Sequence, residues 1–221
     1  MGLFTGISVG VSVTIAQAIG AKDQERASDI LHTGVAFGII FGIVLMVVAL
    51  FAARPILSLL NTPETVIDQA VLYMRIYMVG LPFNIVYNMS TGGMRAWGNS
   101  RTPFMILLVC GILNIVWDAI FVLVIPLGVA GVGIATVLSN VVSCFAALFF
   151  ITRKNNFVTL SLRRLRVNGS LLKKILYIGL PAGVQSIIIT FSNIIVQYHI
   201  NAFGETAVAA FSTYYKVENL I

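Results

Sequence analysis

Asp118 is the most unusual residue of this chain, because it is a carboxylate inside an apolar run. It lies in the stretch NIVWDAIFV, residues 114–122, and no other residue between Pro103 and Pro126 is ionised at neutral pH. A charge at the centre of a membrane-spanning helix costs about 2.5–3.5 kcal/mol on insertion scales. Asp118 therefore needs polar partners, a bound ion, a proton or a water-filled cavity.

Amide and hydroxyl side chains recur at helical spacing around Asp118. Asn114 lies four residues before it, so both share one helix face. Two further polar stripes occupy the neighbouring apolar runs: Asn84, Asn88 and Thr91, and Thr136, Asn140 and Ser143. A carboxylate among such oxygens can bind a hard cation such as Na+ or take up a proton. The pattern predicts a cation or proton site. An Asp that only holds helices together by hydrogen bonds is the alternative.

A fourth polar stripe lies nearer the C-terminus. Ser186, Thr190, Asn193 and Gln197 follow one another at i, i+4, i+7 and i+11 in an Ile-rich run. This spacing puts them on one helix face. We interpret Thr190, Asn193 and Gln197 as the lining of a substrate cavity, with hydrogen bonding between helices as the alternative.

The elements that carry these residues are membrane helices. Hydrophobic residues make up 58% of the 221 positions and charged residues 10%, against roughly 25% charged in soluble domains. A spanning helix needs about 20 mostly apolar residues. Seven runs qualify: 1–20, 29–51, 67–91, 104–125, 130–152, 175–200 and 206–221. Glycine and proline at Gly80–Pro82 and Gly179–Pro181 are expected to interrupt or open two of them.

The basic residues predict the orientation. Eleven of the 14 Lys and Arg residues lie in the first, third and fifth connections: Lys22, Arg26, Arg95, Arg101, Arg153, Lys154, Arg163, Arg164, Arg166, Lys173 and Lys174. Connections rich in Lys and Arg stay in the cytoplasm. The odd-numbered connections are therefore predicted to be cytoplasmic, and the segment 153–174 to be a cytoplasmic linker between two groups of helices.

Several functional classes lack their motifs. The sequence contains no GxxxxGK[ST] phosphate loop, no HExxH metal motif and no GxSxG nucleophile motif. The basic residues fall between apolar runs rather than along one face, which argues against a nucleic-acid partner. Cys110 and Cys144 lie in separate apolar runs and predict neither a disulfide nor a zinc site. We expect no enzyme activity and no cofactor, and an ion gradient as the energy source for any uphill movement.

The sequence also resembles a known family, the multidrug and toxic compound extrusion (MATE) transporters. The matching segments are GISVGVSVTIAQAIGAKDQERA (6–27), YMRIYMVGLPFNIVYN (73–88), MRAWGNSRTP (94–103), NIVWDAIFV (114–122), GVAGVGIATVLSN (128–140), ILYIGLPAGVQSI (175–187) and NAFGETAVAAFSTYYKVENLI (201–221). They follow one another in the family's order over nearly the whole chain.

The resemblance implies an all-α, polytopic helical bundle that belongs to a twelve-span, two-lobe transporter. This chain would contain the second span through part of the eighth. Residues 1–152 would form the N-terminal lobe, 153–174 the linker between lobes, and 175–221 the start of the C-terminal lobe. The family's first-lobe cation or proton site would map onto Asn114, Asp118 and Thr136, with Asn88 as a looser candidate.

The implied activity is secondary antiport at the cell membrane, expected to be a bacterial inner membrane. Na+ or H+ would enter through the Asp118 region while a cationic or amphipathic small molecule leaves. Two alternatives remain open. The chain could belong to a lipid or lipid-linked sugar flippase of a related branch, or it could be a truncated membrane protein that transports nothing. Substrate identity, coupling ion and oligomeric state are not given by the sequence.

Overall fold

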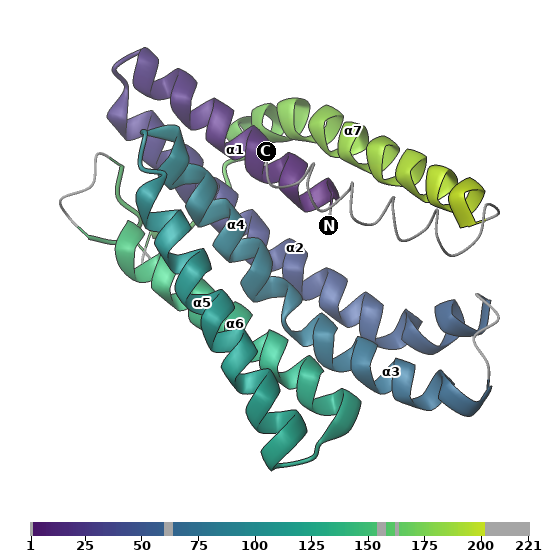
Figure 1. The fold of residues 1–221 in the computed structure, drawn as a ribbon. Coiled ribbons are helices and arrows are strands. Elements are labelled where there is room, and N and C mark those ends of the chain that lie inside the picture. Colours follow the sequence, from purple (N-terminus) through teal and green to yellow (C-terminus); the bar gives the residue numbers. More distant parts are fainter. Residues whose placement is uncertain (1, 60–63, 154–157, 162–163, 202–221) are drawn as a thin grey trace.

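The computed structural model describes residues 2–59, 64–153, 158–161 and 164–201, which are mostly helical and contain no strand (Figure 1). The elements follow in the order α1 (Gly2–Gly20), α2 (Gln24–Leu59), α3 (Glu64–Val79), α4 (Leu81–Ala96), α5 (Arg101–Ala119), the π-helix η1 (Ile120–Val124), α6 (Gly128–Ile151) and α7 (Gly169–Asn201). The expected all-α bundle is confirmed.

Five stretches of the described chain are long and apolar enough to cross a membrane: Gln24–Leu59, Val66–Ala96, Arg101–Val124, Gly128–Ile151 and Gly169–Val196. They correspond to five of the seven predicted spans. The first predicted span is helical too, but its apolar part, Phe4–Gly20, is shorter than the others. The seventh, 206–221, lies outside the described residues.

The predicted third span is broken into α3 and α4 at Gly80. Pro82 stands in the first turn of α4, where its missing N–H costs no hydrogen bond. The Gly-Leu-Pro sequence at 179–181 has no such effect, because α7 continues through Pro181 from Gly169. Only the first of the two expected interruptions therefore separates two helices.

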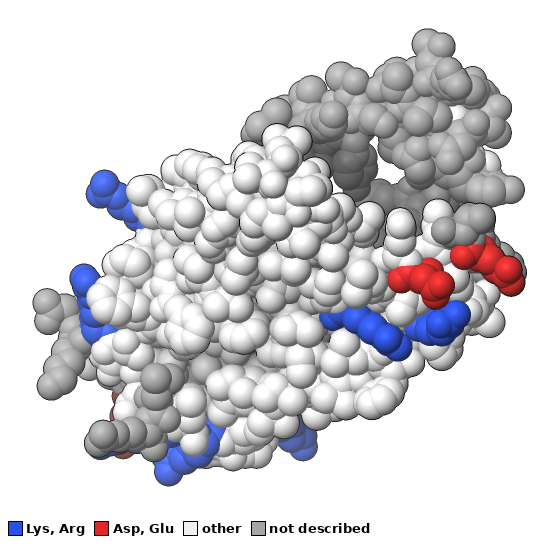
Figure 2. Space-filling view, turned by 90° about the horizontal axis from the view of Figure 1, so that it is seen from below, with Lys and Arg blue, Asp and Glu red and all other residues white. Residues whose placement is uncertain are grey.

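Three connections gather at one end of the bundle. The turn after α1, the turn after α4 and the described linker residues 158–161 and 164–168 lie together in Figure 1. The end of α2, the start of α3 and the turn between η1 and α6 lie at the other end. We call the first end the basic end, because it carries the Lys- and Arg-rich connections. This arrangement is the one that the predicted orientation requires. Figure 2 shows a broad surface without charged side chains between charged ends.

The core lies where α1, α2 and α4 meet. Ile7, Val11 and Ile15 of α1, Leu31 of α2 and Ile85 of α4 are 0–2% exposed. Large apolar side chains also cover the outside of the bundle, and Leu107, Ile115 and Leu123 are more than half exposed. An exposed surface of this kind is suited to lipid.

Glycines let α1 and α7 approach very closely. Gly2, Gly6 and Gly10 recur every four residues on α1 and face α7. A methyl group added to Gly10 would lie 2.9 Å from the Cα atom of Gly179, and one added to Gly6 would meet the backbone of Gly183. Small residues at this spacing let membrane helices pack backbone to backbone.

Candidate functional site

Asp118 and Thr136 lie at similar distances from the turn that joins their neighbouring helices, α5 and α6. Asp118 lies eight residues before Pro126, and Thr136 lies eight residues after Gly128. At 1.5 Å per residue, both are about 12 Å from the turn that joins their helices. Asp118 is correspondingly about 25 Å from Arg101, at the basic end. The carboxylate therefore lies in the half of the bundle away from the basic end.

The Oδ1 atom of Asp118 is buried and has no hydrogen-bond partner among the described residues. Leaving a buried polar atom unsatisfied costs about 1–3 kcal/mol, and more for a charged group. The helix changes from α to π two residues later, at Ile120. Such π-helical turns are frequent at functional sites. Oδ1 thus lacks the hydrogen bond that a buried carboxylate oxygen ordinarily makes.

A network of three asparagines links α4 to α6. The Asn88 amide donates to the backbone carbonyl of Asn84 over 2.8 Å and to its side-chain oxygen over 3.0 Å. The Asn84 amide donates to the side-chain oxygen of Asn140 over 3.3 Å. α1 joins through the Ser8 hydroxyl, which donates to the Asn88 carbonyl over 2.7 Å. The network therefore connects three helices by polar side chains.

The four predicted ion ligands do not form one hydrogen-bonded cluster. In the described part of the chain, no hydrogen bond joins Asp118 to Asn114, Thr136 or Asn88. The Thr136 hydroxyl donates instead to the Val132 carbonyl of its own helix over 3.0 Å. Asn88 belongs to the asparagine network. Among the described residues, the carboxylate on α5 and the amides on α4 and α6 therefore share no hydrogen bond.

Two polar residues of this region were not singled out from the sequence. Ser8 contacts Asn88, as described above, and Ser90 is fully buried with an Oγ atom that has no partner among the described residues. Each stands among small residues, Ser8 between Gly6 and Gly10 and Ser90 two residues before Gly92. Close helix approach at such glycines was the signal available in the sequence.

The predicted substrate residues lie on α7. The Thr190 hydroxyl donates to the Ser186 carbonyl over 2.8 Å, within the helix. Asn193 is half-buried on the same stripe. The side chain of Gln197 lies outside the described residues.

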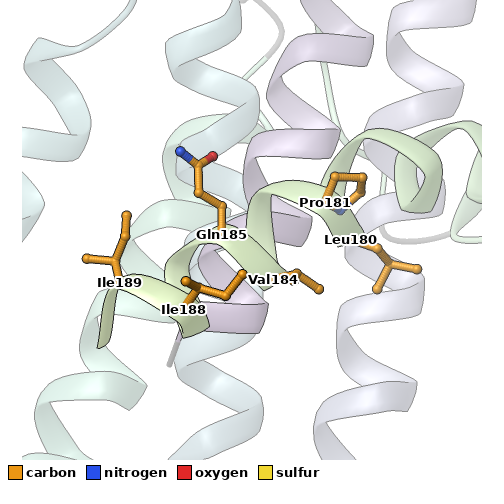
Figure 3. A pocket seen from close by; sticks show the side chains of 6 residues that line it. All are labelled: Leu180, Pro181, Val184, Gln185, Ile188 and Ile189. Atoms are coloured by element: carbon orange, nitrogen blue, oxygen red, sulfur yellow. The ribbon is translucent and has the colours of Figure 1, made fainter. Parts of the chain in front are cut away.

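An apolar cleft of about 560 Å³ runs along a different stripe of α7 (Figure 3). Its lining consists of Leu180, Pro181, Val184, Gln185, Ile188 and Ile189. Gln185 is the polar member of this set. The predicted polar face and the cleft are therefore two separate surfaces of one helix.

The described residues contain no group of three or more His, Cys, Asp or Glu side chains that could hold a metal ion. Cys110 and Cys144 are buried free thiols. An ion at Asp118 would consequently depend on amide, hydroxyl, carbonyl or water oxygens for its other ligands.

Comparison with known proteins identifies the family. The MatE family model matches residues 1–120. The chain belongs to the MatE family. This chain is 31% identical to the probable multidrug resistance protein YoeA of Bacillus subtilis (strain 168) over 223 residues. The alignment covers 98% of this chain and 48% of that protein.

Solved structures agree with this assignment. The outward-facing conformation of a multidrug resistance MATE family transporter is similar with a TM-score of 0.87 at 28% identity, covering 99% of this chain and 49% of that chain. The inward-facing conformation of a MATE family transporter gives a TM-score of 0.83 at 27% identity, covering 99% and 50%. This MatE chain spans about half the length of the relatives it matches and is a membrane protein.

Proposed function

We propose that this MatE chain contributes one lobe, and the beginning of a second, to an ion-coupled antiporter that exports small molecules. Residues 1–152 would form the N-terminal lobe, 153–174 the linker and 175–221 the start of the C-terminal lobe. The family membership and the multidrug resistance names of relatives support this function. A bacterial cell membrane is the expected location, given the Bacillus relative.

The unsatisfied oxygen of Asp118 is the observation that carries the coupling mechanism. A buried carboxylate oxygen without a partner is costly, and binding of Na+ or H+ at the carboxyl group removes its charge. Asn114 lies one turn from Asp118 and Thr136 lies at its level on α6. Both are proposed to supply oxygen ligands after small side-chain rotations. Asn88 would act more indirectly, through the asparagine network.

Transport further requires that the two lobes move against each other. Ion binding on α5 can shift the equilibrium between two arrangements of the lobes only if the two arrangements bind the ion with different affinity. The asparagine network connects α6, which packs beside α5, to α4 and α1. α1 in turn packs against α7 through its glycines. These contacts offer a route by which neutralisation of Asp118 changes the packing between lobes.

The substrate is proposed to be a cationic or amphipathic small molecule that contacts the polar stripe of α7. Thr190, Asn193 and Gln197 supply hydroxyl and amide groups on that stripe. Replacing Asn193 by Leu should then change the range of exported compounds more than the ion dependence. An unchanged range of compounds would remove this stripe from the proposed substrate site.

The coupling proposal is tested with Asp118→Asn in the full-length protein. Efflux of a fluorescent organic cation from proteoliposomes is measured under an imposed Na+ gradient and, separately, an imposed pH gradient. We expect gradient-driven efflux to fall by about tenfold or more, which corresponds to about 1.4 kcal/mol. The wild-type protein identifies the ion, because only the gradient of the coupling ion drives export.

Asp68→Asn is the matched control. It makes the same chemical change at an exposed position, where the carboxylate pairs with Arg54 over 3.4 Å, and it should leave efflux unchanged. Normal ion-coupled export by Asp118→Asn would refute the role of this carboxylate. Lipid flipping without efflux of the cation would favour the flippase function instead.

A further inference from the structure

The linker between the proposed lobes is attached to one face of α2 by side chains. Four residues of α2 make these attachments: Ser28, Asp29, His32 and Thr33. We call them the α2 clamp. They bind Thr159, Ser161, Arg166 and Asn168, so the clamp holds both described parts of the linker. It lies at the basic end of the bundle, next to a polar pocket of about 360 Å³.

The first two attachments hold the linker backbone. The Ser28 hydroxyl donates to the Thr159 carbonyl over 3.0 Å. Nε2 of His32 accepts a hydrogen bond from the backbone N–H of Ser161 over 2.9 Å. The side chains of Val158 and Leu160, which alternate with these backbone contacts, are 1% and 3% exposed. Apolar side chains and polar backbone groups therefore fix this segment together.

The other two attachments extend to the beginning of α7. Arg166 pairs with Asp29 over 3.3 Å, and the backbone N–H of Asn168 donates to the Thr33 hydroxyl over 3.4 Å. The side-chain oxygen of Asn168 in turn accepts from the N–H of Ser170, in the first turn of α7. This is the usual role of an Asn before a helix. The α2 clamp thus connects α2 to the start of α7.

His32 can make its contacts in only one protonation state. A backbone N–H can only donate, so Nε2 must carry a lone pair toward Ser161. Nδ1 lies 2.7 Å from the Ser28 carbonyl oxygen, which can only accept, so Nδ1 must carry the proton. The ring is therefore the neutral Nδ1–H tautomer. His32 is 4% exposed, and water cannot easily replace a lost contact.

We propose that His32 is a pH-sensitive attachment point, whose protonation releases the linker from α2. A proton on Nε2 would point at the backbone N–H of Ser161. Nε2 could then no longer accept a hydrogen bond, and the contact between His32 and Ser161 would be lost. Histidine is the side chain whose charge ordinarily changes near neutral pH. Acidification at the basic end of the bundle would then loosen the connection between α2 and α7.

The charged groups around the ring are balanced in sign. Glu25 and Asp29 of α2 and Arg164 and Arg166 of the linker line the pocket with His32. Lys22, Asp23 and Arg26, in and next to the turn before α2, are exposed. From α6, Ile151 contributes a backbone carbonyl, which accepts from the N–H of Leu160. Once the imidazolium leaves Ser161, it can form an ion pair with Glu25 or Asp29, the two carboxylates of the pocket. The backbone N–H of Ser161 cannot accept a hydrogen bond from it.

The test is the mobility of a nitroxide label at Ser161→Cys, measured in the full-length, reconstituted protein with no other reactive cysteine. The Ser161 side chain is exposed, so the label should leave the backbone contact intact. We expect the label to be immobile at about pH 7.5 and to become mobile on acidification to about pH 5.5. A label with the same mobility at both pH values would overturn the proposal.

Three variants separate titration from packing. His32→Gln keeps a side-chain acceptor that does not titrate, so the label should stay immobile at both pH values. His32→Ala should make it mobile at both. His199→Gln, on α7, removes the other histidine of the sequence and should keep the wild-type response. A pH response that persists in His32→Gln, or disappears in His199→Gln, would contradict the role of His32.

Discussion

The side-chain amide of Asn84 on α4 donates a hydrogen bond to the side-chain oxygen of Asn140 on α6 over 3.3 Å. The two residues are 56 positions apart in the sequence. Asn84 is about 18 Å from the last residue of α4 and Asn140 about 17 Å from the last residue of α6, at 1.5 Å per residue. The bond therefore joins the two helices near the middle of the bundle, between two half-buried side chains.

This bond predicts energetic coupling between Asn84 and Asn140. Hydrogen bonds between membrane helices contribute about 0.6 kcal/mol on average and at most about 2 kcal/mol. The changes that Asn84→Ala and Asn140→Ala cause in the free energy of unfolding should therefore differ from additivity by this amount. A double-mutant cycle of unfolding in detergent micelles measures the difference. Asn84→Ala combined with Asn114→Ala should be additive, because no hydrogen bond joins that pair in the described chain. Additivity of the first pair would argue against the bond.

The packing of α1 on α7 predicts a position-dependent effect of adding a methyl group. In Gly10→Ala the new Cβ atom would lie 2.9 Å from the Cα atom of Gly179, so the helices must move apart. Overpacking of this kind costs about 1–3 kcal/mol. Gly20→Ala is the control on the same helix, because nothing lies within 4 Å of its added Cβ atom. Thermal unfolding of the two variants should differ clearly, and equal stability would contradict the close contact.

Ser90 predicts a substitution that stabilises the protein. Its Oγ atom is buried without a partner among the described residues, and an unsatisfied hydroxyl of this kind costs about 1–3 kcal/mol. Ser90→Ala should leave the free energy of unfolding unchanged or raise it by about 1 kcal/mol. Ser8→Ala should lower it, because the Ser8 hydroxyl donates to Asn88. A marked loss of stability in Ser90→Ala would reveal a partner of the hydroxyl.

The ion pair between Arg54 and Asp68 is predicted to matter little. The two side chains are 62% and 78% exposed, and exposed pairs contribute about 0–1 kcal/mol. Removing either charge should therefore shift the unfolding temperature only slightly at low salt, and not at all at high salt. A large, salt-independent effect would show that this pair is shielded from solvent.

Part of the candidate site was predictable from the sequence, and its contacts were not. Helical spacing placed Asn84 and Asn88 on one face, and Thr136 and Asn140 on another. The absence of other charges between Pro103 and Pro126 identified Asp118 as an unusual carboxylate. Spacing along one helix says nothing about how that helix is rotated against its neighbours. The bond between Asn84 and Asn140, and the missing partner of Asp118, depend on that rotation.

The sequence by itself determined that the chain is a membrane protein and which of its segments are helical. Run length and the scarcity of charge require membrane helices, because the hydrocarbon core accepts only segments with satisfied backbone groups. The Lys- and Arg-rich connections predicted which ends lie together. The break at Gly80 was predictable from glycine and proline, whereas the continuity of α7 through Pro181 was not.

Tertiary structure decided which side chains meet across helices. No metal-ligand motif of the sequence includes His32, yet its ring accepts a hydrogen bond from a backbone N–H 129 residues away. The α1 glycines could have faced any neighbour, and they face α7. These contacts arise when several apolar faces are buried together, and each helix takes the rotation that packs best. That choice is made by the whole bundle, so no single segment encodes it.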